Sequence, residues 1–212
     1  MKIVLAAVET DLVDAWQEHC GDLPDVEVHR GSILDLSVDA VVSPANSFGF
    51  MDGGIDRIYS HHFGWDLQDR LRQRIRTHHH GELVVGSAEI IETGHGRIPF
   101  LIAAPTMRVP MILRETINPY LAARATLLLI RHGTLPAGPL AGEPVSSAVA
   151  SVAFPGLGTG VGRVKPGTCA RQVRAAIEEV VLGRGEFPAT WVEAQHRHQL
   201  LYTDHARDLQ RG

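Results

Sequence analysis

Cysteines and long apolar runs are scarce in this sequence of 212 residues. The only two cysteines, Cys20 and Cys169, do not form a C-x-x-C pair. They cannot build a disulfide framework, so we expect free thiols in a reducing compartment, the cytoplasm. No stretch approaches the ~18 apolar residues of a membrane span. The apolar residues 3–8 are too few for the core of a signal peptide, and no small-residue cleavage site follows them. We therefore expect a soluble protein without a membrane partner.

A strong excess of one charge is also missing. The chain has 20 Lys and Arg residues and 24 Asp and Glu residues, which gives a net charge of −4. Such a balance gives no broad positive field, so nonspecific binding to nucleic acid is not expected. The 44% of hydrophobic and 21% of charged residues are typical of a globular chain. The length fits one domain with a modest appendage.

Apolar runs and helical periodicities alternate along the chain. Buried strands are predicted at 3–8, 26–28, 40–42, 88–91, 98–104 and 149–154. Helices are predicted at 10–20, 53–62, 65–79, 116–131, 168–182 and 188–202. This alternation favours an α/β fold whose central sheet is largely parallel.

Two glycine-rich segments each follow a predicted strand and precede a predicted helix. The first includes Asp52-Gly53-Gly54-Ile55-Asp56, and the second is Phe154-Pro155-Gly156-Leu157-Gly158-Thr159-Gly160-Val161-Gly162. Small residues let backbone N–H groups approach a ligand, and a helix N-terminus adds partial positive charge. Together the segments predict a phosphate or diphosphate site at the carboxyl ends of the strands. The alternative for either segment is a tight turn without a ligand.

Two common nucleotide-binding motifs are excluded. An NTPase phosphate loop requires Gly-Lys-Ser or Gly-Lys-Thr, and neither triplet occurs. A dinucleotide fingerprint requires G-x-G-x-x-G at the start of the first helix, where this chain has Glu9-Thr10-Asp11.

The two segments and their surroundings resemble the macro domain family, whose members bind ADP-ribose. The family's first signature, GDIT…VDAIVNAAN and a glycine-rich loop ending in VD, corresponds here to Gly31-Ser32-Ile33-Leu34, Val38-Asp39-Ala40-Val41-Val42-Ser43-Pro44-Ala45-Asn46 and Asp52-Gly53-Gly54-Ile55-Asp56. The second, a proline followed by a Ser/Gly-Thr-Gly loop, corresponds to Pro155 and Gly158-Thr159-Gly160. The resemblance covers residues 1–182. It implies a three-layer α/β/α fold around a mixed, largely parallel sheet.

The resemblance also implies a ligand site. Asn46 matches an asparagine that hydrogen-bonds the distal ribose, and the two glycine loops match loops that hold the diphosphate. The implied ligand-binding residues are Ser32, Ile33, Ala45, Asn46, Gly53, Gly54, Ile55, Gly158, Thr159, Gly160, Val161 and Gly162.

Asn46 and Asp56 are the implied catalytic residues. Asp56 matches an aspartate that orients or activates water in hydrolytic members. Without the resemblance, it would be an ordinary acidic residue in the first turn of a helix, where the helix dipole favours a negative charge. On that basis we expect its carboxylate to remain ionised.

Several positions depart from the family pattern. Ser32 replaces the aspartate that contacts the adenine amino group, which predicts weak adenine selectivity or a contact from another residue such as Asp35. Ser43 and Pro44 replace an asparagine and an alanine. Gly162 replaces an aromatic residue that packs on the ribose, which predicts a more open pocket. Arg108 follows a predicted strand and is either a phosphate contact or a solvated loop residue.

The sequence leaves two main functions open. The first is hydrolysis that removes mono-ADP-ribose from modified proteins, with acidic side-chain esters as the expected linkage, or that de-esterifies O-acyl-ADP-ribose. The second is a reader module that binds without turnover, and a scaffold without nucleotide binding is a third possibility. The partners are ADP-ribose and mono-ADP-ribosylated protein, and nucleic acid is a partner only as an ADP-ribosylated substrate. No cofactor is required.

Two further expectations concern metal binding and domain organisation. The adjacent residues His78, His79 and His80 point in different directions on a helix, so no metal site is predicted. Residues 1–185 are expected to form the macro-like domain, and residues 186–212 a helical extension packed on it.

Overall fold

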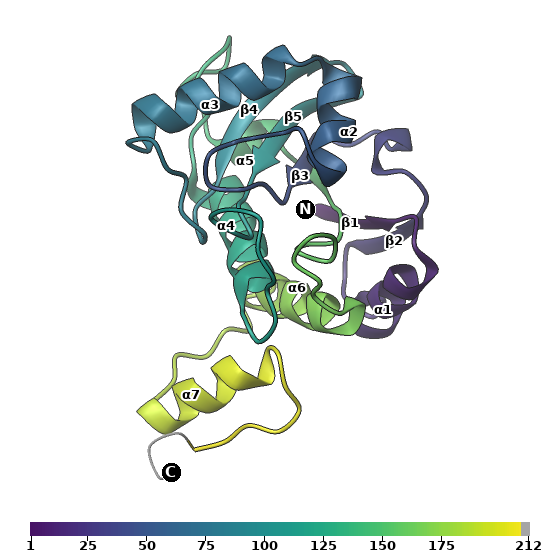
Figure 1. Cartoon of the computed structure of the whole chain (residues 1–212), viewed down its shortest axis with the longest axis vertical. Coiled ribbons are helices and arrows are strands. Elements are labelled where there is room, and N and C mark those ends of the chain that lie inside the picture. Colours follow the sequence, from purple (N-terminus) through teal and green to yellow (C-terminus); the bar gives the residue numbers. More distant parts are fainter. Residues whose placement is uncertain (209–212) are drawn as a thin grey trace.

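A six-stranded mixed sheet forms the centre of the computed structural model, which describes residues 1–208 (Figure 1). The strands lie in the order β2-β1-β6-β3-β5-β4. Their bounds are Lys2–Ala7 for β1, Val26–Arg30 for β2, Ala40–Ser43 for β3, Glu89–His95 for β4, Ile98–Ala103 for β5 and Ser151–Phe154 for β6. All neighbours pair in parallel except β4 and β5, which are antiparallel. The predicted fold class is confirmed.

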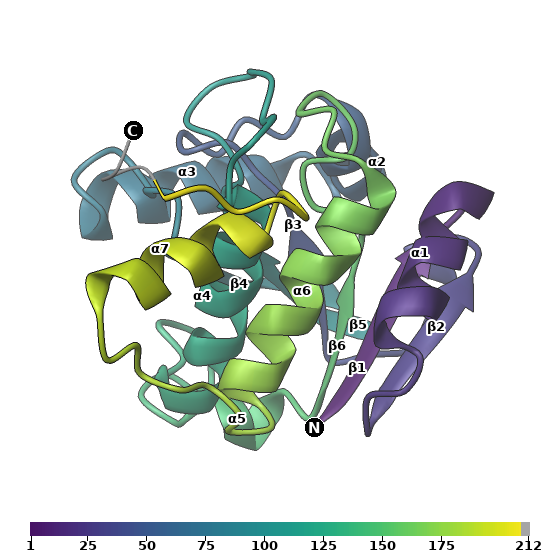
Figure 2. The same ribbon diagram turned by 90° about the horizontal axis from the view of Figure 1, so that it is seen from below.

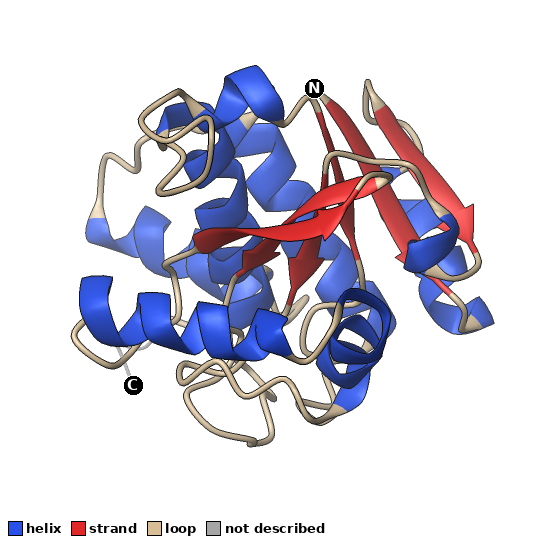
Figure 3. Ribbon diagram, turned by 90° about the horizontal axis from the view of Figure 1, so that it is seen from above, coloured by secondary structure: helices blue, strands red, loops and turns tan. Residues whose placement is uncertain are grey.

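Helices cover both faces of the sheet, which gives three layers (Figure 3). The helices are α1 Thr10–Cys20, α2 Gly54–Phe63, α3 Asp66–His78, α4 Asn118–His132, α5 Val145–Ala148, α6 Pro166–Val180 and α7 Trp191–Leu200. Along β1, Ile3 and Leu5 pack in one core with α1, α4 and α6, whereas Val4 and Ala6 pack in another with α2 and α3. This division follows from the alternation of side chains along a strand.

Proline and glycine end many of these elements where the sequence indicated. Pro44 and Pro155 immediately follow β3 and β6, because a residue without an N–H cannot continue a ladder. Gly21 and Gly133 follow α1 and α4. Two short elements were not predicted, the 3-10 helix Ile33–Asp35 and helix α5.

Other boundaries shift by a few residues. Strand β4 continues to His95, four residues beyond its predicted end, because it forms a hairpin with β5. The last helix begins at Trp191 rather than at 188, where the Thr190 hydroxyl accepts a hydrogen bond from the N–H of Glu193 and caps it.

The C-terminal segment lies on the outer side of α4 and α6 (Figure 2). Arg171 and Gln172 of α6 donate hydrogen bonds to the carbonyl oxygens of Leu200 and Leu201. These contacts support our proposal that residues 186–212 form an extension of the domain. Its last four residues, 209–212, lie outside the described part.

Candidate functional site

A cavity of about 560 Å³ opens at the carboxyl edge of the sheet. Its walls come from the residues that follow β1, β2, β3, β5 and β6, together with the first turn of α2. They are Ala6–Glu9, Leu12, Gly31–Ile33, Pro44–Asn46, Phe50, Asp52–Asp56, Ile58, Thr106, Met107, Pro110, Pro155, Gly156 and Gly158–Gly162. This volume is in the range of small-molecule sites, and ligands of open α/β sheets bind at this edge. All the predicted site residues line this cavity, and their roles remain predictions.

The first glycine loop presents free backbone at the mouth of the cavity. A Cβ atom built on Gly53 or Gly54 meets no heavy atom within 4 Å. Gly54 also has φ +54°, a conformation that side chains rarely adopt. The N–H groups of the first turn of α2 have no intrahelical acceptor, so they can receive an anion.

The glycines of the second loop divide into two kinds. A Cβ on Gly162 would lie 2.5 Å from the carbonyl oxygen of Gly158, and one on Gly158 would contact Leu113 at 3.0 Å. Gly160 has open space around its Cβ position. Gly162 is therefore required by packing and Gly158 by its φ of +69°, whereas Gly160 leaves the backbone accessible to a ligand.

Leu113 explains why no aromatic residue stands at position 162. Its N–H donates to the Gly162 carbonyl at 2.8 Å, and its Cδ1 atom would lie 2.8 Å from a Cβ there. Gly162 is buried by this contact. Leu113 fills the space beside Gly162, so a larger side chain there requires the loop to move.

Asn46 holds its own loop in shape. Its Oδ1 accepts hydrogen bonds from the N–H groups of Phe48 and Phe50 at 3.1 and 3.3 Å, and its Nδ2 donates to the Phe50 carbonyl at 2.8 Å. An amide nitrogen has two hydrogens, so one remains for a ligand. Loop geometry and any ribose contact thus depend on the same side chain.

Asp56 is a buried carboxyl group with a neutral partner. It is 8% exposed, and its Oδ1 accepts a hydrogen bond from the Ser43 hydroxyl at 2.6 Å. Burial raises the pKa of Asp56 to about 7, although the Ser43 hydrogen bond acts in the opposite direction. Burial thus works against the ionised form that we expected from the position of Asp56 at the start of a helix. At neutral pH the group is therefore poised between its acid and base forms.

Ser43 was recognised in the sequence only as a departure from the family pattern. It ends β3, is fully buried and is 13 residues from Asp56 in the sequence. The buried strand followed by Pro44 was the only local signal that Ser43 lies next to the site, which it contacts through Asp56.

At the other end of the cavity, Ser32 and Ile33 begin the loop after β2. The Ser32 Oγ accepts a hydrogen bond from the Leu34 N–H at 3.2 Å and caps the 3-10 helix. Asp35 does not line the cavity, but Glu9, which sequence reasoning did not single out, does.

Arg108 lies outside the cavity. Its Nε donates to Glu82 Oε1 at 2.8 Å, and its guanidinium carbon lies 5.1 Å from the centroid of the Phe48 ring. Lys, Arg and His are absent from the described lining, and its ionisable side chains are Glu9, Asp52 and Asp56. Any phosphate here would bind to backbone N–H groups.

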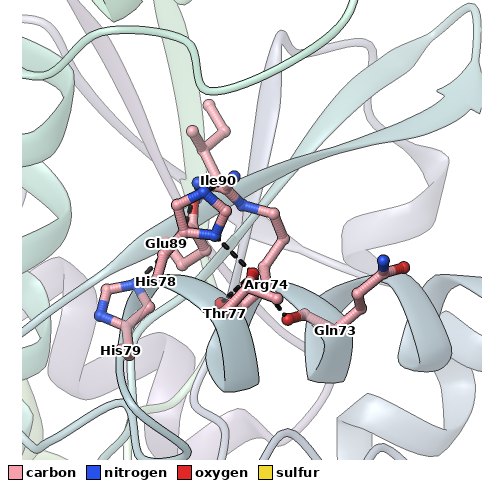
Figure 4. A network of polar contacts seen from close by, with 7 residues as sticks. All are labelled: Gln73, Arg74, Thr77, His78, His79, Glu89 and Ile90. Carbon is pink, nitrogen blue, oxygen red and sulfur yellow. Dashed lines mark hydrogen bonds and ion pairs between the residues drawn. The ribbon is translucent and has the colours of Figure 1, made fainter.

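His78 and His79 belong to a polar network on α3 and β4 (Figure 4). His79 Nε2 lies 3.0 Å from Oε2 of the buried Glu89, and Arg74 Nη2 lies 3.1 Å from the same oxygen. His78 contacts Thr77 and Arg74 instead. No group of three or more His, Cys, Asp or Glu side chains that could hold a metal ion occurs within residues 1–208.

Two further cavities are lined in part by charged side chains that already have partners. One of about 650 Å³ lies between α4, α6 and the C-terminal segment, where Arg197 pairs with Glu186 and Arg131 donates to the Val180 carbonyl. The other, of about 390 Å³, lies beside Arg74. Neither of these cavities combines glycine loops with accessible backbone and a buried acid that has no cationic partner.

Both cysteines are free and buried, as expected for unpaired thiols. Burial raises the pKa of each to about 12, so neither is a thiolate at neutral pH. Within the described residues, no helix is both long enough and apolar enough to cross a bilayer.

Comparison with known proteins gives one family. The model of the macro domain matches residues 42–173. An uncharacterized protein of Aquifex aeolicus is 30% identical over 156 residues, which cover 74% of this chain and 81% of that protein. An uncharacterized protein of Aeropyrum pernix is 30% identical over 171 residues, which cover 80% and 78%.

Solved structures show the same fold at lower identity. The macrodomain of Mycobacterium tuberculosis DarG has a TM-score of 0.56 and 19% identity, and the alignment covers 70% of this chain and 87% of that one. The Oceanobacillus iheyensis macrodomain with ADP has a TM-score of 0.57 and 19% identity, with 81% and 84% covered. At this identity the likeness concerns the fold alone.

Proposed function

Because the chain belongs to the macro domain family, whose model matches more than half of its length, we propose that it binds ADP-ribose and hydrolyses its bond to a modified protein. The expected substrates are acidic side-chain esters, and O-acyl-ADP-ribose is the small-molecule counterpart. Among the structural neighbours, the Oceanobacillus iheyensis macrodomain was solved with ADP and a mutant of it with ADPR.

The binding part of the proposal is supported by the two glycine loops. Gly53 and Gly160 line the same cavity and both have open space at their Cβ positions, so a diphosphate bound between the two loops would receive backbone N–H groups from both. The base would lie toward Ser32 and Ile33, and the distal ribose toward Asn46.

The catalytic part of the proposal is based on one observation. Asp56 lies buried at the wall of the cavity, and its pKa is raised to about 7. A general base works best when its pKa lies near the operating pH. In its ionised form Asp56 accepts a proton from the attacking water, whose oxygen bonds to the carbon that carries the acceptor. The bond to the acceptor side chain then breaks, and ADP-ribose is released.

Calorimetric titration with ADP-ribose tests binding, with Gly160→Val as the disrupting variant. A branched side chain at position 160 blocks the approach of phosphate to the loop, yet the open space there leaves the fold intact. We expect at least 10-fold weaker binding. Gly96→Val is the matched control, because Gly96 also faces open space but lies in the β4–β5 hairpin, at the opposite edge of the sheet. Unchanged binding by folded Gly160→Val would contradict the placement of the diphosphate.

Release of ADP-ribose from a mono-ADP-ribosylated protein tests turnover. A protein that binds ADP-ribose but releases none from Glu-, Asp-, Arg- or Ser-linked substrates is a reader module. A protein that does not bind ADP-ribose at all uses the fold as a scaffold. The two buried free thiols support the cytoplasm as the proposed location.

A further inference from the structure

Glu9 and Ser32 follow the ends of the neighbouring strands β1 and β2. In the parallel register Ala7 pairs with Arg30, and the N–H of Gly31 donates to the Ala7 carbonyl at 2.9 Å. Two residues beyond each paired position are Glu9 and Ser32, and both line the cavity. The two strand ends are also tied together by the side chain of Arg30, which donates to the Thr10 hydroxyl at 3.1 Å.

Ser32 is poorly suited to accept a hydrogen bond from a ligand. Its oxygen already accepts the Leu34 N–H, so the hydroxyl mainly offers its hydrogen as a donor. Glu9 is an unused acceptor, because its carboxylate forms no hydrogen bond or ion pair with any residue of the described chain. The charged acceptor for an amino group at this end of the cavity therefore follows β1, whereas the residue that follows β2 offers only a neutral hydroxyl that is already engaged.

The other two carboxyl groups of the lining are on the far side of the cavity. Asp56 hydrogen-bonds Ser43 at the end of β3, and Asp52 precedes α2 by two residues. The sheet order β2-β1-β6-β3 puts three strand spacings between β2 and β3. At ~4.8 Å per spacing this is about 14 Å. Glu9 is thus the only carboxylate of the described lining at the β2 end.

We propose that Glu9 selects adenine by accepting a hydrogen bond from the exocyclic amino group of the base. This inference rests on the proposed binding of ADP-ribose, because it concerns the base end of the same site. Hypoxanthine has an oxygen at the position of that amino group, and two acceptors facing each other repel. Glu9 thereby reverses the expectation of weak selectivity that followed from Ser32 alone.

The Glu9→Gln substitution isolates this role. The side chain of Glu9 makes no cap hydrogen bond to α1, and its backbone carbonyl accepts from Leu12 and Val13 whatever the side chain. The variant should therefore fold normally. A glutamine amide can turn either its oxygen or its nitrogen toward the base, so it can accept from the amino group of adenine or donate to the oxygen of hypoxanthine, with little preference between them. Glu18→Gln is the matched control, an exposed position on the same helix and outside the cavity.

The experiment is calorimetric titration of native protein and both variants with ADP-ribose and its inosine counterpart. A site that hydrogen-bonds a ligand group rejects an analogue without it, so we expect the native protein to prefer ADP-ribose by about 10-fold or more. Glu9→Gln should bring the two affinities close together, and Glu18→Gln should keep the native ratio. In the double variant Glu9→Gln with Ser32→Asp, a carboxylate on the neighbouring strand end should restore the preference.

The outcomes separate this inference from the function on which it rests. If the native protein binds neither nucleotide, the proposed function fails and Glu9 has no base to select. If the native protein binds ADP-ribose but shows no preference, or Glu9→Gln keeps the full preference, the role of Glu9 is wrong and ADP-ribose binding stands.

Discussion

Two buried acids of similar exposure have opposite surroundings in this molecule. Glu89, 5% exposed, lies between Arg74 and His79 on the outer strand β4, whereas Asp56, 8% exposed, has only the Ser43 hydroxyl as a side-chain partner. Glu89 is compensated by a guanidinium that fixes α3 to the sheet. Asp56 lines a cavity, and no cation compensates its negative charge. Burial therefore disfavours the ionised form and raises the pKa of Asp56 to about 7. The comparison teaches that burial alone does not identify a candidate functional acid. A buried acid that has no cationic partner and lies beside a cavity is such a candidate.

The largest expected effect is the loss of turnover in Asp56→Asn. The change preserves shape and the Ser43 hydrogen bond but removes the proposed base, so release of ADP-ribose should fall by roughly 10²–10⁴-fold. Affinity for free ADP-ribose should remain, because the glycine loops are unchanged. Single-turnover release and calorimetry measure the two effects, with Asp69→Asn on the exposed face of α3 as control. Native turnover in Asp56→Asn would mean that water is activated elsewhere.

The second effect concerns stability and pH. The pKa of Asp56 is about 7 in the folded state against 3.8 for the ordinary group, so the folded protein binds the proton more tightly. Its contribution to the free energy of unfolding is therefore fully present below pH ~4 and is lost as the pH rises to 7, by on the order of 4 kcal/mol. Denaturant unfolding at pH 4, 5.5, 7 and 8 measures the slope, which Asp56→Asn should reduce. Equal slopes in native protein and variant would refute the raised pKa.

Glu89→Gln should destabilise the fold and leave the chemistry intact. It removes the charge that faces Arg74 and leaves a guanidinium without a full counter-charge, at a cost of about 3 kcal/mol. Denaturant midpoints should therefore fall, and turnover per folded molecule should equal that of the native protein. Glu143→Gln, at an exposed loop position, serves as the control. A loss of turnover in folded Glu89→Gln would erase the distinction between the two acids.

The smallest effect is that of Ser43→Ala. The Ser43 hydroxyl stabilises the ionised form of Asp56 and thereby lowers its pKa, so its loss should raise that pKa further. A hydrogen bond to a charged group is worth about 1.5 kcal/mol or more. If Asp56 acts as a base, native turnover increases with pH around 7, and in Ser43→Ala this rise should move to higher pH. Ser43→Thr keeps a hydroxyl and should stay near the native profile, whereas an unmoved midpoint in Ser43→Ala would show that Ser43 does not act through Asp56.

Most of the fold could be predicted because its signals are local. The apolar run of β1 and the proline after β3 are visible in a few consecutive residues. The extension of β4 to His95 depends on its pairing with β5, and α5 is a short element inside a loop rich in glycine and proline. Such features depend on tertiary contacts that no short window of sequence contains.

The sequence predicted many of the residues that line the cavity, but it did not predict the ionisation of Asp56. The motifs identified the loops, and every residue that they indicated lines the cavity. The ionisation of Asp56 depends on how completely the surrounding structure excludes water from it, which the sequence does not express. The importance of Glu9 depends on the β1–β2 register, and the importance of Ser43 on a contact across 13 residues.

The lack of Lys, Arg and His in the described cavity lining has a kinetic consequence. Neutral amide groups displace few counterions when they bind phosphate, so affinity for the ligand should not fall steeply as ionic strength rises. They also exert no long-range electrostatic attraction on the ligand. The association rate constant should therefore be ~10⁵–10⁶ M⁻¹s⁻¹, the value for association without electrostatic steering. Such a pocket attracts competing polyanions only weakly. It recognises phosphate by the direction of its backbone dipoles rather than by net charge.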